Sequence, residues 1–501
     1  MSTDVLLVED LSQQRLPART LAAVLQRAGW RVRLAHFSEN ADALIALAQR
    51  ERPRLIIFSI LFAGRVPEHL ARVTALRQSG VRAHITLVGP LPSFAAAELL
   101  AACPALDSVL CGEAEASVVQ LACRSPTLDF QSAAFRLPNN PQAEACTPEK
   151  AGLNLDQLPF PLHDDGLPSY QGYGFATLEA SRGCYHACTF CLPCAFYRAA
   201  GAPYRLRGVT NVVDEIEELY QRGARLFLFD DEQFLPPGCA RKERVEALAR
   251  ELERRSLRIA FTIKCRADDL DAALFSRLQA MGLLRVYIGI ESGSQATLDL
   301  LGKSVTARHN VEALTMLDTL DLVADFRSLL FHPWSTLETV EADMAFLQSV
   351  MPCVSTCFNF QEVEVYPGTR LAARLRAEGQ SAGVPWPLSY TIADPCVELL
   401  RRLNRLIFGS RTYTGMQDQL TRAWYELLLQ QRFQPERFAP AAARQLKAAA
   451  AHINAASLDV WREMLDFATS GKIHNADLVN TRAAGWAGRL NALGASPGII
   501  E

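Results

Sequence analysis

The sequence predicts an α/β protein with three parts: a doubly wound, Rossmann-like N-terminal domain, a partial (β/α)6 barrel and an α-helical C-terminal domain. Two observations predict this class. Short apolar runs typical of strands alternate with helical runs over most of the chain, whereas the last part has helical periodicity and few strand signals. Strands that alternate with helices in this way indicate parallel sheets covered by helices. The expected boundaries are 1–125, then a linker over 126–170, the barrel over 171–375 and the helical domain over 376–501.

The N-terminal part repeats one strand–helix unit. The predicted strands are 5–10, 30–37, 55–62, 85–89 and 108–111, and the predicted helices are 17–29, 41–51, 67–79, 93–102 and 113–123. Both faces of such a sheet are covered by helices, and ligands bind beyond the carboxyl ends of its strands. The loops at 9–15, 59–64 and 89–93 are therefore the predicted binding rim. A purely structural domain that binds no ligand stays open as the alternative.

The barrel follows a stretch rich in proline and polar residues. Its prolines are Pro126, Pro138, Pro141, Pro148, Pro159, Pro161 and Pro168. Such a composition is typical of a linker. Beyond it the predicted strands are 174–181, 226–230, 259–265, 286–291, 322–331 and 357–366, separated by predicted helices at 211–222, 241–255, 269–281, 306–319 and 336–349. Six strands are too few for a closed eight-unit barrel, so we expect an open one with its catalytic face at the carboxyl ends of the strands.

Composition and charge place the chain among ordinary globular proteins. It has 501 residues, 49% of them hydrophobic and 21% charged, with a formal net charge of −3, so nothing favours nucleic acid as a partner. The N-terminus lacks the pattern of a secretory signal, and no apolar run approaches the ~20 residues of a membrane span. We therefore expect a cytoplasmic protein without a membrane partner. In that compartment thiols stay reduced, so a tight group of cysteines indicates a metal site.

One loop concentrates the cysteines. The stretch SRGCYHACTFCLPC, from Ser181 to Cys194, holds four of the thirteen. Structural zinc sites normally use two ligand pairs separated by a longer loop, which makes zinc the weaker alternative. Closely spaced thiolates favour an iron–sulfur cluster instead. A ferredoxin would use Cys194 as the fourth ligand, but a simple electron carrier needs neither a barrel nor a chain of this length.

The spacing Cys184-x3-Cys188-x2-Cys191, with Gly183 before the first cysteine and Phe190 before the third, resembles the motif of radical S-adenosylmethionine (SAM) enzymes. Four further motifs at predicted strand ends resemble, in their order, the branch of this family that carries an N-terminal cobalamin (B12)-binding domain. They are FLFDDEQF at 227–234, CRAD at 265–268, GIESGS at 289–294 and VEVYPGT at 363–369. The resemblance covers most of residues 1–375.

This resemblance implies a [4Fe–4S] cluster whose fourth iron is left for the amino and carboxylate groups of SAM. The implied cluster ligands are Cys184, Cys188 and Cys191. The implied SAM contacts are Phe190 at the adenine, one of Asp230, Asp231 and Glu232 at the ammonium group, Arg266 and Arg327 at the carboxylate, and Glu291 and Ser292 at the ribose. Ordinary packing or ion pairing stays the alternative for these side chains. Cys194 is predicted not to ligate iron, because a fourth thiolate would leave no position for SAM.

The resemblance also implies a cobalamin site in the N-terminal domain. Cobalamin domains of this class often carry Asp-x-His-x-x-Gly after the first strand, Ser-x-Leu after the third and Gly-Gly after the fourth. Here Ser59 and Leu61 match the second motif, Gly89 keeps one glycine of the third, and Gly112 with Glu113 resembles the end of the domain. The first motif lacks its histidine, because residues 9–15 read EDLSQQR. Cobalamin without a histidine ligand and a domain that has lost cobalamin are both compatible with this departure.

The activity that the resemblance implies is reductive cleavage of SAM to a 5′-deoxyadenosyl radical, which removes a hydrogen atom from an unactivated carbon. With cobalamin present, we predict a C-methyltransferase that acts on a small molecule in specialised metabolism, with flavodoxin or ferredoxin as electron donor. A radical dehydratase, cyclase or rearrangement enzyme that transfers no methyl group is the second reading, and an iron–sulfur electron carrier is the third. The sequence identifies neither the substrate nor a residue that acts on it.

Overall fold

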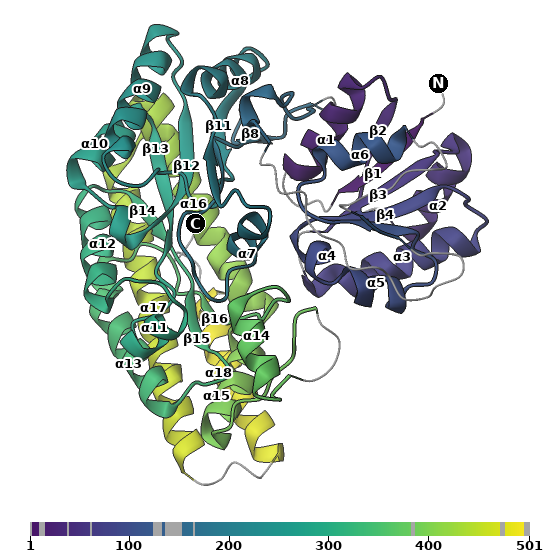
Figure 1. Ribbon diagram of the computed structural model, residues 1–501. Helices are drawn as coiled ribbons and strands as arrows, with labels where there is room; N and C mark the ends of the chain where they lie inside the picture. The colour runs from purple at the N-terminus through teal and green to yellow at the C-terminus, as the bar shows by residue number, and fades with distance from the viewer. Residues whose placement is uncertain are drawn as a thin grey trace. The chain divides into compact units, whose positions relative to one another are not determined.

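The computed structural model describes residues 3–9, 16–37, 40–60, 63–123, 133–135, 153–163, 166–381, 386–470 and 476–494. The chain divides into two compact units, each made of separate stretches. The first unit comprises Met1–Ala224, Leu228–Gln233 and Val365–Ser389, and the second comprises Arg225–Phe227, Phe234–Glu364 and Tyr390–Glu501. Each unit is described in turn (Figure 1).

The first unit begins with a six-stranded sheet in the order β2-β1-β3-β4-β5-β6. Its strands are β1 (Val5–Glu9), β2 (Val32–His36), β3 (Leu55–Ser59), β4 (His84–Val88), β5 (Ser108–Leu110) and β6 (Ala133–Phe135). The pairs β1–β2, β1–β3, β3–β4 and β4–β5 are parallel, and β6 is antiparallel to β5. The doubly wound prediction is confirmed. The expected linker also contributes a strand, because β6 extends the edge of this sheet.

Helices cover both faces of the sheet, as Figure 1 shows. They are α1 (Leu16–Arg27), α2 (Ala41–Glu51), α3 (Val66–Gln78), α4 (Pro90–Phe94), α5 (Ala96–Ala102) and α6 (Glu115–Ala122). Side chains alternate along each strand, so Val5 and Leu7 pack with α1 and α6, while Leu6 and Val8 pack with the other four helices. The single helix predicted over 93–102 is two helices, because Ala95 leaves the helical conformation at φ −128° and ψ 24°.

The rest of the first unit surrounds the cysteine-rich segment. Its elements are β7 (Ser169–Tyr170), β8 (Tyr173–Leu178), β9 (Ser181–Gly183), α7 (Leu192–Ala199), β10 (Tyr204–Leu206), α8 (Val209–Gln221) and α14 (Arg370–Ala377). The N-terminal apolar core extends into this region, because Leu192 of α7 and Trp386 are buried in it. The loop that carries the cysteines is thus anchored on the core of the N-terminal sheet.

The barrel strands form a second six-stranded sheet in the order β14-β13-β12-β11-β8-β7. Its strands beyond β8 are β11 (Ala224–Phe229), β12 (Ala260–Arg266), β13 (Leu283–Gly289) and β14 (Val323–Asp325). The pairs β12–β13 and β13–β14 are parallel, as expected for a barrel sheet. The strand predicted over 322–331 is divided into β14 and β15 (Ser328–Phe331), and β15 pairs in parallel with β16 (Phe360–Glu362) as a separate sheet.

The helices of the second unit complete the partial barrel and form the predicted helical domain. They are α9 (Ala240–Arg254), α10 (Ala272–Met281), α11 (Gln295–Leu300), α12 (Ala307–Thr319), α13 (Leu337–Val350), α15 (Pro395–Ile407), α16 (Arg411–Phe433), α17 (Pro440–Thr469) and α18 (Ala476–Gly494). Trp461 on α17 is buried and stacks on Phe331 and Phe408, with ring centroids 5.9 and 6.2 Å away. Among the helices that the structure describes, none has the length and apolarity to cross a membrane.

Candidate functional site

The cysteine loop, Cys184–Cys191, begins where β9 ends and stops where α7 begins. Gly183 enters the loop at φ +81°, and a Cβ atom at this position would lie 2.2 Å from the carbonyl oxygen of Pro203. Only glycine tolerates both conditions without a shift of the backbone. This close approach allows the Cys184 N–H to donate to the Pro203 carbonyl at 2.8 Å, which fixes the first cysteine of the loop.

Two helices hold the carbonyl groups of the cysteine loop. Arg198 on α7 donates to the carbonyl oxygens of Tyr185 at 3.0 Å and His186 at 2.8 Å. Arg370 on α14 donates to the carbonyl oxygen of Ala187, and the Leu371 N–H donates to Thr189 at 2.9 Å. These bonds tie the backbone of the loop to both helices and so contribute to its shape.

The three predicted cluster ligands lie together in this loop as half-buried free thiols, and Cys191 is the residue that caps α7. Three thiolates on one loop are a donor set that suits iron, so the residues present fit a [4Fe–4S] cluster. Cys194 differs, because it is buried inside α7 and its sulfur donates to the His186 carbonyl at 2.7 Å. The Cys194 sulfur is also hydrogen-bonded to the Cys191 thiol, so its place outside the ligand set stays a prediction.

The three acidic residues after β11 have different surroundings. Asp231 is 1% exposed and accepts from the Ala180 N–H at 3.0 Å and the Ser181 hydroxyl at 2.5 Å, so its carboxylate supports β9. Asp230 is half-buried and Glu232 is exposed. The pKa of the Cys191 thiol is raised by its hydrogen bond with Cys194, by burial and by the nearby Glu232 carboxylate. Glu232 therefore lies close to a predicted iron ligand.

The predicted SAM residues in the second unit differ in the hydrogen bonds and ion pairs that their polar atoms already form. Arg266, at the end of β12, is 5% exposed and donates to the Asp268 carboxylate at 2.9 Å and to the Lys303 carbonyl. Glu291 has a positive φ of 64° and accepts from the buried Lys303 amine at 3.1 Å. Arg327 is exposed, and its guanidinium lies 5.9 Å from the centre of the Tyr287 ring.

Ser292 is held inside the second unit by helix α13. Its hydroxyl donates to the Asp343 carboxylate at 2.6 Å and accepts from the Ser294 N–H at 3.0 Å, while the Gly293 N–H also donates to Asp343 at 2.6 Å. Burial raises the pKa of Asp343 to about 6, although these hydrogen bonds act in the opposite direction. The Ser292 side chain thus supports the loop after β13.

The predicted cobalamin residues lie at the carboxyl ends of β3, β4 and β5. Ser59 ends β3 and is buried, and Gly89 follows β4 at φ +126°. A Cβ atom on Gly89 would lie 2.4 Å from the Ile60 carbonyl oxygen, so the two loops meet backbone to backbone. The Gly112 N–H donates to the Ser93 hydroxyl at 2.9 Å. These residues lie at the strand ends where a doubly wound sheet binds its ligands, so the cobalamin contacts stay a prediction. Leu61 and residues 10–15 lie outside the described part of the chain.

Glu113 belongs to a buried ion network that the sequence did not reveal. Arg182, two residues before Cys184, donates to Glu113 at 2.9 Å, to Glu115 at 2.5 Å and to Glu179 at 2.8 Å. Arg205, its cross-strand neighbour on β10, donates to Glu113 at 2.7 Å. The network links the rim after β5 to the strand that leads into the cysteine loop.

The charges of this network compensate each other. Burial opposes the charge of Arg182, but Glu115, Glu179 and Glu113 keep its pKa above the ordinary value. Burial raises the pKa of Glu179, and Arg182 acts in the opposite direction. A buried charge without partners is costly, so the guanidinium and the three carboxylates depend on one another. The signal available in the sequence was an arginine inside a short strand next to the first cysteine.

Comparison with known families agrees with this arrangement. Residues 8–122 match the B12 binding domain, and residues 178–339 match the Radical SAM superfamily. The chain therefore belongs to the radical SAM enzymes, in the branch with an N-terminal cobalamin-binding domain. Its cofactors are a [4Fe–4S] cluster, SAM and cobalamin.

Proteins that are similar to this chain are named for different activities. An uncharacterized methyltransferase of Pyrococcus horikoshii is 25% identical over 63% of this chain and 68% of its own length. The hopanoid C-3 methylase of Methylococcus capsulatus is 26% identical over 72% of this chain and 68% of its own. The anaerobic magnesium-protoporphyrin IX monomethyl ester cyclase of Rubrivivax gelatinosus is 26% identical over 51% of this chain and 47% of its own.

The fold is shared with a solved structure. The cobalamin-dependent SAM radical enzyme OxsB, with aqua-cobalamin and SAM bound, superposes with a TM-score of 0.73 at 16% identity. The superposition covers 98% of this chain and 80% of that chain. At this identity the likeness establishes the fold alone, including the helical C-terminal region.

Proposed function

We propose that this enzyme is a cobalamin-dependent C-methyltransferase that acts on an unactivated carbon of a small molecule. The observation that carries the proposal is the combination of an intact three-cysteine loop with a cobalamin-type rim on the same chain. The methylase and methyltransferase matches, which each extend over more than three fifths of the chain, support the same activity. Specialised metabolism is the proposed setting.

When bound, the cluster and cobalamin supply one-electron cleavage of SAM and transfer of a methyl group. The chain supplies binding and orientation. Cys184, Cys188 and Cys191 would hold the irons, and the bonds from Arg198 and Arg370 would keep these thiolates in place. Of the three acidic residues, Asp230 and Glu232 are the better candidates for the SAM ammonium group, since the Asp231 carboxylate is bound to β9.

The remaining proposed SAM contacts are ranked by their present partners. Phe190 is half-buried in the cysteine loop and is proposed to pack on the adenine. In the second unit Glu291, Ser292 and Arg266 already bind Lys303, Asp343 and Asp268 through their polar groups. Arg327 is therefore preferred among the four. In the N-terminal domain Ser59, Gly89 and Gly112 are proposed to contact cobalamin, while Glu113 is proposed to support the rim through Arg182.

Product analysis tests the proposal. The reconstituted enzyme is incubated anaerobically with SAM, a reductant and candidate substrates, with and without cobalamin. A methyltransferase that also uses the radical forms both 5′-deoxyadenosine and S-adenosylhomocysteine in a cobalamin-dependent way. The Cys184→Ala variant is the control, because loss of a cluster ligand must remove 5′-deoxyadenosine. Turnover of a substrate that never yields S-adenosylhomocysteine would contradict methyl transfer.

The second candidate is radical chemistry without methyl transfer. It is favoured by the match to a cyclase and by the segment FHPWSTLE at 331–338, which departs from the Gly-x-Pro-Gly-Glu-Thr type of turn that the resemblance to radical SAM enzymes implies. In the structure this segment ends β15 and begins α13, and His332 is buried. The same assay separates the two candidates, since a cyclase or dehydratase yields 5′-deoxyadenosine and a product without an added methyl group.

A further inference from the structure

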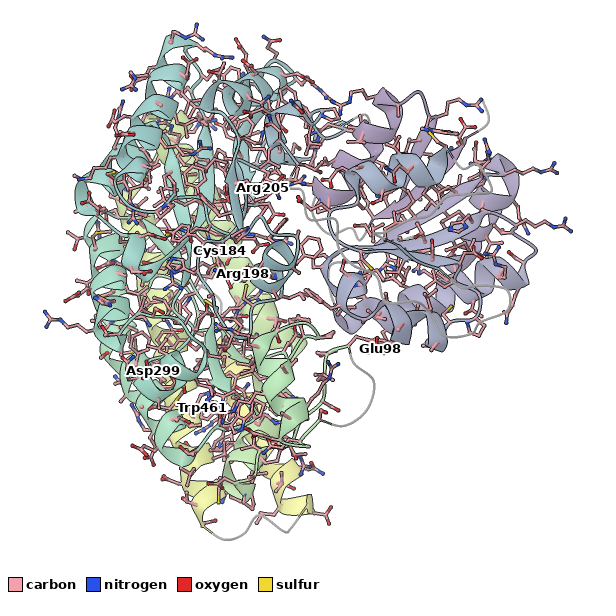
Figure 2. The ribbon with its side chains drawn as sticks, viewed as in Figure 1. Glu98, Cys184, Arg198, Arg205, Asp299 and Trp461 are labelled. Carbon is pink, nitrogen blue, oxygen red and sulfur yellow. The ribbon has the colours of Figure 1, made fainter. Side chains whose placement is uncertain are left out.

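Four exposed arginines lie on the two helices that hold the cysteine loop. They are Arg198 on α7 and Arg370, Arg374 and Arg376 on α14, and we call them the loop-side arginines. Both helices belong to the first unit, so this surface is defined within one compact part of the molecule. Arg198 and Cys184 are both labelled in Figure 2.

Hydrogen bonds connect this surface directly to the predicted cluster ligands. Arg198 donates to the carbonyl oxygens of Tyr185 and His186, and Arg370 donates to that of Ala187. These three residues are the ones between the first and second cysteines, and Ala187 is exposed. Arg198 and Arg370 therefore lie where the backbone between the first two cysteines meets solvent, and Arg374 and Arg376 follow on the same helix as Arg370.

The surface has an excess of positive charge. Arg374 pairs with Glu378 at 2.8 Å, but both side chains are well exposed, at 47% and 35%, so water weakens this pair. Glu378 and the exposed Glu232, which lies close to Cys191, are two carboxylates against four guanidinium groups, so a net positive charge remains. The whole chain has a net charge of −3, so the excess is local and not a property of the composition.

We propose that the loop-side arginines form the docking surface for an acidic protein that donates single electrons. This inference rests on the proposed function, which requires an electron from outside. One electron leaves a reduced flavin or iron–sulfur centre of the donor and enters the cluster, and docking itself forms and breaks no covalent bond. Electron-transfer complexes are small and transient, and complementary charge mainly accelerates their formation.

The reduction rate of the cluster tests this surface. The Arg374→Glu/Arg376→Glu double variant reverses two charges without touching the arginines that bind the loop. Stopped-flow absorbance follows bleaching of the cluster by reduced flavodoxin, an acidic donor, and by reduced methyl viologen, a small cation. We expect the flavodoxin rate to fall about tenfold at low ionic strength and to lose most of its salt dependence. The viologen rate should stay unchanged or rise.

The matched control is an arginine-to-glutamate substitution at another exposed site of the first unit. Arg82 is exposed and lies just before β4, at the opposite end of that sheet from the predicted rim, so Arg82→Glu should leave both rates unchanged. Equal flavodoxin rates for the wild type and the double variant would overturn the proposal. An equal fall with both reductants would also overturn it, since it assigns the arginines to loop structure. Failure of viologen-reduced wild type to cleave SAM would instead contradict the proposed function.

Discussion

The surroundings of the cysteine loop and the helical C-terminal region are stabilised in different ways. Around the loop, Arg182 joins three carboxylates in a buried network, and arginines from two helices bind loop carbonyls. In the C-terminal region, Trp461 is packed between the aromatic rings of Phe331 at the end of β15 and Phe408, which caps α15. Charged partners must meet at hydrogen-bond distance, whereas apolar packing tolerates small shifts. The comparison indicates that geometry is specified most tightly next to the predicted cofactors.

The largest expected effect is on the iron–sulfur cluster, and it should differ between Cys184 and Cys194. Cys184→Ala should lose the cluster and all SAM cleavage, because one iron loses its thiolate. Cys194→Ala should keep both, because Cys184, Cys188 and Cys191 remain as the three predicted ligands. Iron and sulfide content with the absorbance spectrum of the anaerobically reconstituted proteins measures the difference. Loss of the cluster in Cys194→Ala would show that the fourth cysteine is a ligand.

The next prediction compares the buried ion network around Arg182 with the aromatic packing around Trp461. Arg182→Met leaves buried carboxylates without their cation and should cost about 3–5 kcal/mol in the free energy of unfolding. Trp461→Ala should cost a similar ~3–5 kcal/mol through loss of apolar contacts. Only the arginine variant should also weaken cobalamin binding, because Arg182 holds the rim through Glu113. Denaturant titration and equilibrium binding of hydroxocobalamin measure these effects, and equal binding by both variants would remove the proposed role of the network.

A smaller effect is expected at the rim itself. Gly89→Ala places a Cβ atom against the Ile60 carbonyl at a positive φ, whereas Gly29→Ala introduces it at φ +90° with open space around it. The strained backbone costs about 1–3 kcal/mol in each case. Weakened cobalamin binding should accompany the Gly89 variant alone, which titration with hydroxocobalamin can show. Unchanged binding in both variants would place cobalamin away from this loop.

The smallest effect concerns pH. Burial lowers the pKa of His69 to about 3, with Arg72 and Arg65 adding to the shift, and the ring packs against Phe37 and Phe58. Below pH 6.5 the His69 ring is protonated in the unfolded chain but stays neutral in the folded protein. The free energy of unfolding therefore falls as the pH drops from 6.5 to about 3. His69→Leu should reduce this acid loss, by at most ~1.4 kcal/mol per pH unit. Denaturant midpoints at pH 7 and pH 5 measure it; an identical loss in both proteins would contradict the assignment.

Asp343 in the second unit gives the opposite sign. Its pKa is raised to about 6, so the folded state holds a proton that the unfolded chain releases above pH 3.8. Its contribution to stability is therefore greatest in acid and declines as the pH rises from 3.8 to about 6. Asp343→Asn should flatten this part of the pH profile. The profile is measured in the His69→Leu variant, which removes the opposite effect of His69. A flat profile between pH 3.8 and 6 in that variant would contradict the buried state of Asp343.

The sequence predicted the strand–helix alternation and the cysteine loop because both depend on neighbours along the chain. It did not predict the division of the strand over 322–331, which depends on Ser328 pairing with Phe360 far along the sequence. Nor did it reveal that Ser292 binds Asp343 or that Arg182 binds Glu115, since these partners are 51 and 67 residues apart. A motif indicates which residues gather at a site, while tertiary packing determines which polar atoms already have partners.

The second helix that holds the cysteine loop comes from a distant part of the chain. Leu371 binds Thr189, and Gly368 leaves no room for a side chain beside Phe94, where a Cβ atom would lie 2.2 Å from the ring. Trp386 completes the apolar core under the N-terminal sheet. The contacts that complete the shape of the loop therefore come from residues nearly two hundred positions later in the chain. The loop can therefore offer its cysteines in their final geometry only after α14 has been synthesised.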